Sequence, residues 1–210
     1  NATSPTTTFN GVAGTTYTLQ WTITNGVCAS SSDQVDISLQ QTPTTAAAGG
    51  DQNICGTSAI LAGNTPTIGT GVWSVFSGAG GSFVLNTNPT TTFNGVAGTT
   101  YVLRWTITNG VCATSSDDVQ IRLDQAPTSS NAGLDQTGAS AICGTSTTLT
   151  GNAPTIGTGL WTITAGAGGS FVNAASPTTV FNGVAGTTYT LTWTISNGVC
   201  TASADNVDIS

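Results

Sequence analysis

The stretch Tyr-Val-Leu-Arg-Trp-Thr-Ile-Thr-Asn-Gly, residues 101–110, predicts how this chain folds. Apolar and polar residues alternate along it, and its four large apolar residues share one face: Tyr101, Leu103, Trp105 and Ile107. A period of two is typical of a β-strand with one buried face, and Asn-Gly directly after such a strand is typical of a hairpin turn. Because residues 119–123 alternate in the same way, the stretch predicts an antiparallel hairpin.

The sequence of this hairpin occurs three times in the chain. The sequence Phe-Asn-Gly-Val-Ala-Gly-Thr-Thr-Tyr occurs at residues 9–17, 93–101 and 181–189, so the copies are spaced by 84 and then 88 residues. A segment with Pro-Thr-Ile-Gly-Thr-Gly and a tryptophan occurs twice, at 66–73 and 154–161. A period of this length is too long for a solenoid turn and suits a small domain. The chain therefore repeats a domain-sized unit.

The repeats divide the chain into three units. We expect residues 1–41, the first unit, to be the second half of a domain, and residues 44–124 and 128–210, the second and third units, to be complete. Short Pro/Thr/Ala linkers join them. Each complete unit has about seven short expected strands, separated by turns with Gly and Pro, and no helical period. This pattern predicts an all-β antiparallel β-sandwich. In the second unit we expect Trp73 and Trp105 in the core and Phe76 exposed.

The composition excludes several functions. Charged residues are 5% of the chain, and the net charge of −7 argues against nucleic acid or an anionic membrane as a partner. No apolar run approaches the roughly 18 residues that a membrane span needs. Since His and Lys are absent, Ser-His-Asp and lysine chemistry are excluded. The adjacent carboxylates of Asp117 and Asp118 are expected on opposite faces of a strand. We therefore expect no catalysis.

Three motifs of the third unit support a family resemblance: Asn131-Ala-Gly-Leu-Asp-Gln, Thr148-Leu-Thr-Gly, and the stretch from Gly186 to Cys200. With them the chain resembles the PKD-like branch of Ig-like repeats, which occur in large secreted and cell-surface proteins of Bacteroidota-type bacteria. The resemblance covers essentially the whole chain. It implies tandem Ig-like modules that act outside the cell as stalks or adhesive fibres.

The five cysteines recur with the unit. Cys55 and Cys112 are 57 residues apart, as are Cys143 and Cys200. We expect one disulfide within each complete unit, which would place the protein in an oxidising compartment, extracellular or at the cell surface; free buried thiols are the alternative. Cys28 has no partner in the first unit. Its partner is expected in an upstream part of a longer chain, or in another subunit that completes the half-domain.

Aspartates also recur at equivalent positions. If they gather near the ends of the units, they could bind Ca²⁺ and stiffen the joints; the alternative is that they cap backbone groups in turns. No other cofactor is expected. The candidates for a calcium site are Asp51, Asp117, Asp135 and Asp205.

The function that the sequence favours is a structural repeat segment of an extracellular fibre, stalk or filament, with neighbouring copies of itself as partners. The alternative is an adhesin module that binds a cell or a glycan through variable loops. The units differ mainly by a four-residue insertion, Gly138–Ala141, and such similar loops favour the structural role.

Overall fold

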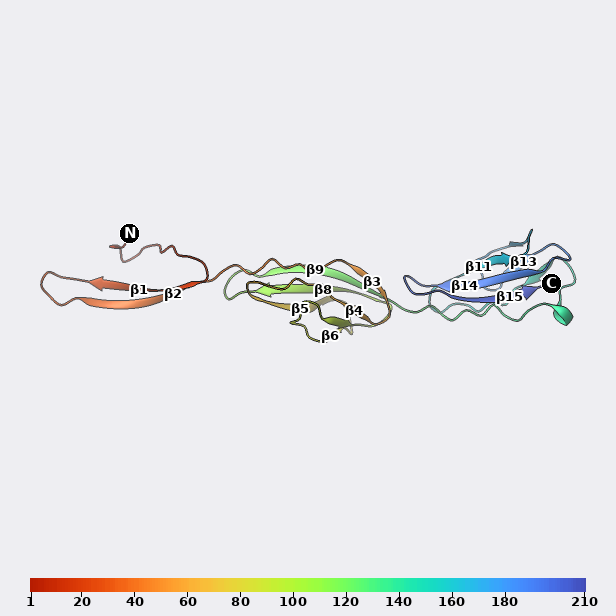
Figure 1. The fold of residues 1–210 in the computed structure, drawn as a ribbon, viewed down its shortest axis with the longest axis horizontal. Coiled ribbons are helices and arrows are strands. Elements are labelled where there is room, and N and C mark those ends of the chain that lie inside the picture. The colour runs from red at the N-terminus through yellow and green to blue at the C-terminus, as the bar shows by residue number, and fades with distance from the viewer.

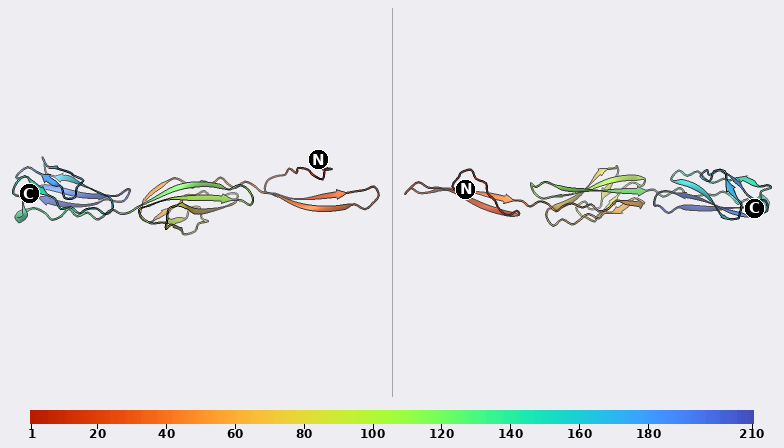
Figure 2. Two further views of the ribbon diagram at one scale, coloured as in Figure 1. Left: turned by 180° about the vertical axis from the view of Figure 1, so that it is seen from behind. Right: turned by 90° about the horizontal axis from the view of Figure 1, so that it is seen from above.

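The computed structural model describes residues 1–210 and forms a rod of three bodies in a row (Figures 1 and 2). The bodies correspond to the three units, and their long strands run roughly along the rod. All regular structure is β, apart from one 3-10 turn at Gly138–Ser140. Each unit meets its neighbour end to end. We call the end that carries the Asn-Gly turn the turn pole, and the opposite end the far pole.

The second unit is a sandwich of two sheets, with strand orders β3-β9-β8-β5 and β4-β7-β6. Its strands are β3 (Gln52–Cys55), β4 (Ser58–Ile60), β5 (Thr70–Ser77), β6 (Ser82–Phe83), β7 (Thr92–Asn94), β8 (Thr99–Thr108) and β9 (Ser115–Asp124). The predicted all-β, Ig-like sandwich is confirmed. Its sheets are antiparallel except at one edge, where β3 runs parallel to β9, a pairing that alternation alone does not encode.

Strand β8 lies inside the larger sheet because its inward side chains fill the core. They are fully buried: Tyr101, Leu103, Trp105 and Ile107. Trp105 packs on Trp73 of β5 with ring centroids 5.1 Å apart. Phe93 of the other sheet meets Tyr101 edge to face at 4.8 Å, a favourable arrangement for aromatic rings. The predicted inward tryptophans are therefore confirmed.

The third unit repeats this architecture. Its sheets have the orders β11-β14-β15 and β10-β13-β12, built from β10 (Ser146–Thr148), β11 (Thr158–Ala165), β12 (Ser170–Phe171), β13 (Val180–Asn182), β14 (Tyr189–Ser196) and β15 (Ser203–Ile209). The four-residue insertion loops out as the 3-10 turn. The chain then rejoins the sheet, where the backbone N–H of Ile142 donates to the oxygen of Ser210 at 2.9 Å.

The first unit contains only two paired strands, β1 (Thr15–Ile23) and β2 (Ser31–Leu39). Its inward face is open: Trp21 is 39% exposed, whereas the equivalent Trp105 is 0% exposed. A groove of about 520 Å³ lies along this face, lined by residues that include Trp21, Leu19 and Phe9. Phe9 still packs on Tyr17 at 4.9 Å, as Phe93 packs on Tyr101, although residues 8–10 form no counterpart of β7.

Candidate functional site at the joints between units

A disulfide joins the second unit to the third. Cys55 ends β3 at the far pole of the second unit, and Cys200 closes the Asn-Gly turn of the third. Their Cα atoms lie 4.9 Å apart, a separation typical of disulfides. We call this disulfide the interunit bridge. It crosses the joint, so it ties two sandwiches together and contributes nothing to the interior of either.

The expected disulfides within the units, Cys55–Cys112 and Cys143–Cys200, are wrong. Cys55 lies level with Asp124, the last residue of β9, whereas Cys112 lies in the turn before β9 begins. β9 has 10 residues, and a strand rises about 3.3 Å per residue. The two thiols therefore lie at opposite poles, on the order of 30 Å apart, and a disulfide needs Cα atoms within about 7 Å.

The three other cysteines have free thiols. Among the cysteines in the turns, burial increases with the amount of the preceding unit that is present. Cys28, with no unit before it in the structure, is exposed, and Cys112, which follows a half-unit, is half-buried. Cys200 follows a complete unit and is 8% exposed. Cys143, the third-unit equivalent of Cys55, is exposed at the far pole. A turn cysteine is therefore covered by the first half of the unit before it.

Asp124 links the two sandwiches beside the bridge. The backbone N–H of Val199 donates to Oδ2 of Asp124 at 2.9 Å, and Nε of Arg122 donates to Oδ1 at 2.7 Å. The Val199 amide, followed by Arg122, holds the pKa of Asp124 below its usual range, and burial acts in the opposite direction. Gly198 has a φ of 53°, and a Cβ there would overlap the Asp124 carboxylate.

Both joints share one hydrogen-bond pattern. Nδ2 of Asn197 donates to the backbone oxygen of Gln125 at 2.7 Å, and Nδ2 of Asn109 donates to that of Gln41 at 2.8 Å. In each case the turn asparagine reaches a glutamine one or two residues past the last strand of the preceding unit. The joint is therefore a repeated structure, and the interunit bridge forms at the one joint where both cysteines are present.

Sequence reasoning did not identify Asp124, Arg122 or Asn197 as joint residues. The sequence of the turn did contain a signal for such contacts. Asn-Gly is sufficient for the hairpin turn, yet Val-Cys follows it in every unit. An exposed valine such as Val27 next to a cysteine has no role in folding the hairpin itself. Such recurrence indicates contact with a neighbour.

The four aspartates proposed for calcium do not converge. Each accepts a hydrogen bond from a backbone N–H at 2.8–2.9 Å, which ties the segment at the start of its unit to the last strand. Asp117 and Asp205 lie within β9 and β15, Asp51 and Asp135 lie in the segments that start the units, and no group of three or more His, Cys, Asp or Glu side chains is placed to hold a metal ion. The acceptor–donor pairs are Asp51–Gln120, Asp117–Ala48, Asp135–Asp208 and Asp205–Ala132.

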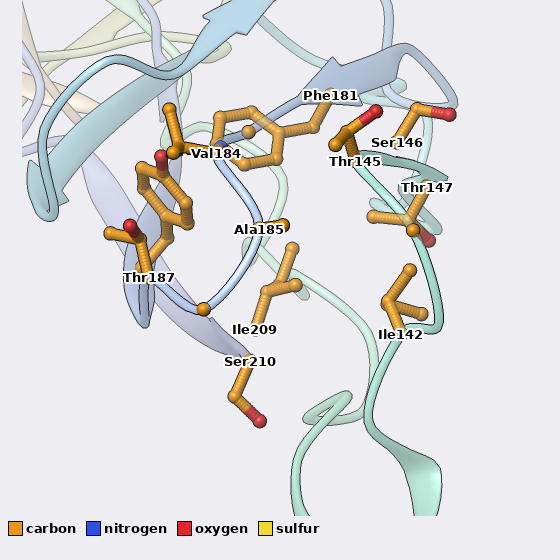
Figure 3. A pocket seen from close by; sticks show the side chains of 14 residues that line it. Ile142, Thr145, Ser146, Thr147, Phe181, Val184, Ala185, Thr187, Ile209 and Ser210 are labelled. Atoms are coloured by element: carbon orange, nitrogen blue, oxygen red, sulfur yellow. Dashed lines mark hydrogen bonds between the residues drawn. The ribbon is translucent and has the colours of Figure 1, made fainter.

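Figure 3 shows a pocket of about 50 Å³ at the far pole of the third unit, between Ile142, Val184 and Ile209. Gly183 is part of its wall. The lining combines apolar side chains with serine and threonine hydroxyls and contains no charged side chain.

The outer face of the second unit carries a charged cluster. Nε of Arg104 donates to Asp118 at 2.7 Å, and the guanidinium lies 3.9 Å from the ring centroid of Phe76. Phe76 is 60% exposed, as expected. The Arg104 hydrogen bond lowers the pKa of Asp118. Asp118 and the adjacent Asp117, which accepts from Ala48, point to opposite faces as predicted, so they form no carboxylate pair.

None of the elements is a helix of the length and hydrophobicity that a membrane span requires. No protein-family model and no curated protein matches the chain. Among solved structures, the insect immune protein hemolin is similar at 11% identity and a TM-score of 0.44, over 92% of this chain and 56% of that one. The extracellular cadherin domains 1–5 of protocadherin gamma B2 are similar at 11% identity and a TM-score of 0.35, over 92% and 45%.

The N-terminal Ig1-2 module of the Drosophila receptor protein tyrosine phosphatase DLAR is similar at 14% identity and a TM-score of 0.30, over 80% of this chain and 98% of that one. The chain spans about half the length of the hemolin and protocadherin chains that it matches. At such identities the likeness concerns the tandem β-sandwich fold alone.

Proposed function

We propose that the chain is a structural repeat segment of an extracellular fibre or stalk, which holds its two ends at a fixed distance. The observation that carries the proposal is the interunit bridge between Cys55 and Cys200. A disulfide inside a sandwich would stabilise that sandwich. A disulfide across a joint instead limits the motion of one sandwich relative to the next, which is the property that a rod needs.

The joints support the proposal further. Domains within one chain usually move relative to one another unless their interface is large. Here each joint combines a short linker with an asparagine hydrogen bond, Asn109 to Gln41 and Asn197 to Gln125. The second joint adds the Asp124–Val199 hydrogen bond and the bridge. These contacts restrain bending at each joint.

The proposed location is extracellular or at the cell surface, because disulfides persist in oxidising compartments. The resemblance to PKD-like repeats adds that the parent protein is a large surface or secreted protein of bacterial type. The proposed partners are neighbouring copies of the same unit. Nucleic acid and membrane lipid are not proposed, since a chain with a net charge of −7 is repelled by both phosphate backbones and anionic headgroups.

The alternative function, a ligand-binding adhesin, has weaker support from the same geometry. The small pocket in Figure 3 is lined by apolar, serine and threonine side chains and holds no charged side chain that could fix a ligand. The main loop difference between the units is the turn at Gly138–Ser140, which offers no buried polar group. We propose no catalytic role, because the aspartates described above hold backbone amides or arginine.

Small-angle X-ray scattering of the oxidised protein tests the proposal. We expect the profile of a single extended rod and, for Cys55→Ser, a broader distribution of shapes as the joint loosens. Cys112→Ser is the matched control, because Cys112 is outside the bridge, and it should scatter like the unaltered protein. An oxidised protein whose units fold back on one another into a compact particle would contradict the structural role.

A further inference from the structure

Every unit contains two Asn-Gly pairs, one after the phenylalanine of the repeated motif and one in the hairpin turn. Asparagine before glycine is a labile context for deamidation, because glycine has no side chain to hinder attack on the asparagine side chain. The backbone nitrogen of the glycine attacks Cγ of the asparagine, so the reaction requires a glycine N–H that is free. In the two complete units, the two kinds of pair differ in this respect.

The pairs that follow phenylalanine are protected by the smaller sheet. The N–H of Gly95 donates to the oxygen of Thr57 at 2.8 Å, and Gly183 makes the equivalent hydrogen bond in the third unit. Asn94 is also paired with a strand on each side. Attack by the Gly95 nitrogen would break its hydrogen bond and unpair the strand. We therefore expect these pairs to react slowly.

The pairs in the turns have free glycine nitrogens. Neither Gly110 nor Gly198 donates a hydrogen bond, and both residues are exposed. The side-chain amides of Asn109 and Asn197 are instead bonded through Nδ2 across their joints. Because deamidation expels Nδ2, it must break the hydrogen bond that crosses the joint. These pairs therefore react when the joint opens.

Deamidation would reverse the chemistry of the contact. A carboxylate accepts hydrogen bonds and donates none, so after conversion one oxygen would face another across the joint. At the second joint the new charge would also lie near the carboxylate of Asp124, which occupies the space next to Gly198. At the first joint the corresponding neighbour of Gly110 is the uncharged Gln40. Conversion therefore weakens both joints, and the second more than the first.

We propose that Asn109 and Asn197 are sites of spontaneous deamidation, that they react when their joint opens, and that conversion keeps the joint from closing again. The inference goes beyond the proposed structural role, because it concerns the joints whatever the parent protein does. A joint that stays closed keeps its asparagine. A joint that opens for long enough becomes permanently flexible.

The reaction needs only water as a co-reactant. The nitrogen of Gly110, after losing its proton to solvent, forms a bond to Cγ of Asn109, and the bond between Cγ and Nδ2 breaks. Nδ2 takes up a proton and leaves as ammonia, and a five-membered succinimide remains. Water then opens the ring at either carbonyl and yields aspartate or isoaspartate. The net change replaces an amide NH2 with OH, without oxidation.

Mass spectrometry of the 210-residue protein, incubated folded at neutral pH, measures the conversion. Trypsin releases residues 105–122, in which Asn109 is the single asparagine, and fragment spectra of the C-terminal peptide separate Asn197 from Asn182. We expect Asn109 to convert on the order of tenfold faster than Asn94, where a paired strand must open first. Denatured protein is the control, in which all these pairs should react alike. Equal rates in the folded protein would overturn the proposal.

The interunit bridge provides a test of joint opening. Cys55→Ser removes the bridge, so Asn197 should convert faster in this variant, while Asn109 in the other joint should keep its rate. Cys112→Ser is the matched control, because Cys112 is outside the bridge, and it should leave the rate at Asn197 unchanged. An unchanged rate at Asn197 in Cys55→Ser would show that joint opening does not control the reaction, and the proposal would be wrong.

Asn197→Asp tests the consequence of conversion. In a reduced and oxidised glutathione buffer it should give less bridged protein than the unaltered chain, because closing the joint brings the new carboxylate against the Gln125 oxygen and towards Asp124. Asn182→Asp is the matched control, since it makes the same change before a glycine at an exposed position of β13, and it should form the bridge normally. Equal bridging by the two variants would contradict the proposal that conversion keeps the joint open.

Discussion

Cys55 and Cys200 are 145 residues apart in the sequence, yet their Cα atoms lie 4.9 Å apart across the joint between two sandwiches. The oxidised protein should therefore have three free thiols, at Cys28, Cys112 and Cys143, and gain two more on reduction in denaturant. Alkylation followed by mass measurement counts them. Under native conditions the two exposed thiols should react before that of Cys112. A count of one free thiol would mean that the units bridge internally.

Gly198→Ala should weaken the second joint. The added methyl group would overlap the Asp124 carboxylate, and the positive φ of 53° disfavours any side chain. Gly26→Ala is the matched control, because Gly26 has a φ of 55° and open space around its Cβ position. Both variants place a side chain at a strained positive φ, but only Gly198→Ala also collides with the neighbouring unit. We expect less bridged protein for Gly198→Ala in a glutathione buffer.

The amount of bridge can be read by trypsin. After free thiols are alkylated and the protein is denatured, cleavage follows Arg104 and Arg122, the only two basic residues. Fragments 1–104 and 123–210 then stay together only through the interunit bridge. Equal yields of the joined fragments from Gly198→Ala and Gly26→Ala would show that the close approach to Asp124 does not matter for the joint.

Acid should loosen the joint through Asp124. Its pKa is lowered in the folded state, first by the Val199 amide and then by Arg122. A carboxylate with a lowered pKa adds stability that is complete above its unfolded pKa, about 3.9, and is lost as the pH falls through the folded value. In Cys55→Ser, where no bridge masks the effect, scattering should show the joint loosening only below about pH 4.

Two controls test this assignment in the Cys55→Ser background. Asp124→Asn should be loose at neutral pH and show no acid transition. Asp118→Asn should keep the transition, because Asp118 pairs with Arg104 on the outer face of the second unit, away from the joint. A transition that persists in Asp124→Asn would assign the acid sensitivity to another group.

Tyr101→Phe should destabilise the second unit by about 1–3 kcal/mol, because the lost hydroxyl leaves two part-buried backbone groups unpaired. Tyr101 accepts from the Val96 N–H at 2.9 Å and donates to the Ala79 oxygen at 2.8 Å. Tyr17→Phe, the control in the open first unit, loses only the bond from Val12, which lies near water. Hydrogen exchange should show faster opening of β8 and unchanged protection of β14. Equal effects in both strands would contradict a local role.

The sequence predicted the strands because alternation and burial are local properties. Residues 101–108 were expected as a strand and lie within β8, and the inward position of Trp105 follows from the same period. The exposed Phe76 followed from the same rule, since it cannot share a face with Trp73.

The cysteine partners could not be read in this way. Cys55 and Cys112 are in one unit, but strand direction places them at opposite poles, and direction is decided by which strands pair. The parallel pairing of β3 with β9 sets the pole of Cys55, and no periodicity encodes it. Nor could Asp124 be assigned, because its role depends on the turn of a different unit.

The interunit bridge also determines how the chain responds to mechanical tension. A pull applied to Asn1 and Ser210 passes from Cys55 directly to Cys200, so residues 56–199 form a slack covalent loop that carries no force. At about 3.3–3.6 Å per extended residue, this loop stores roughly 500 Å of contour length. The oxidised rod therefore cannot release this length when it is stretched, and reduction of one bond makes it available.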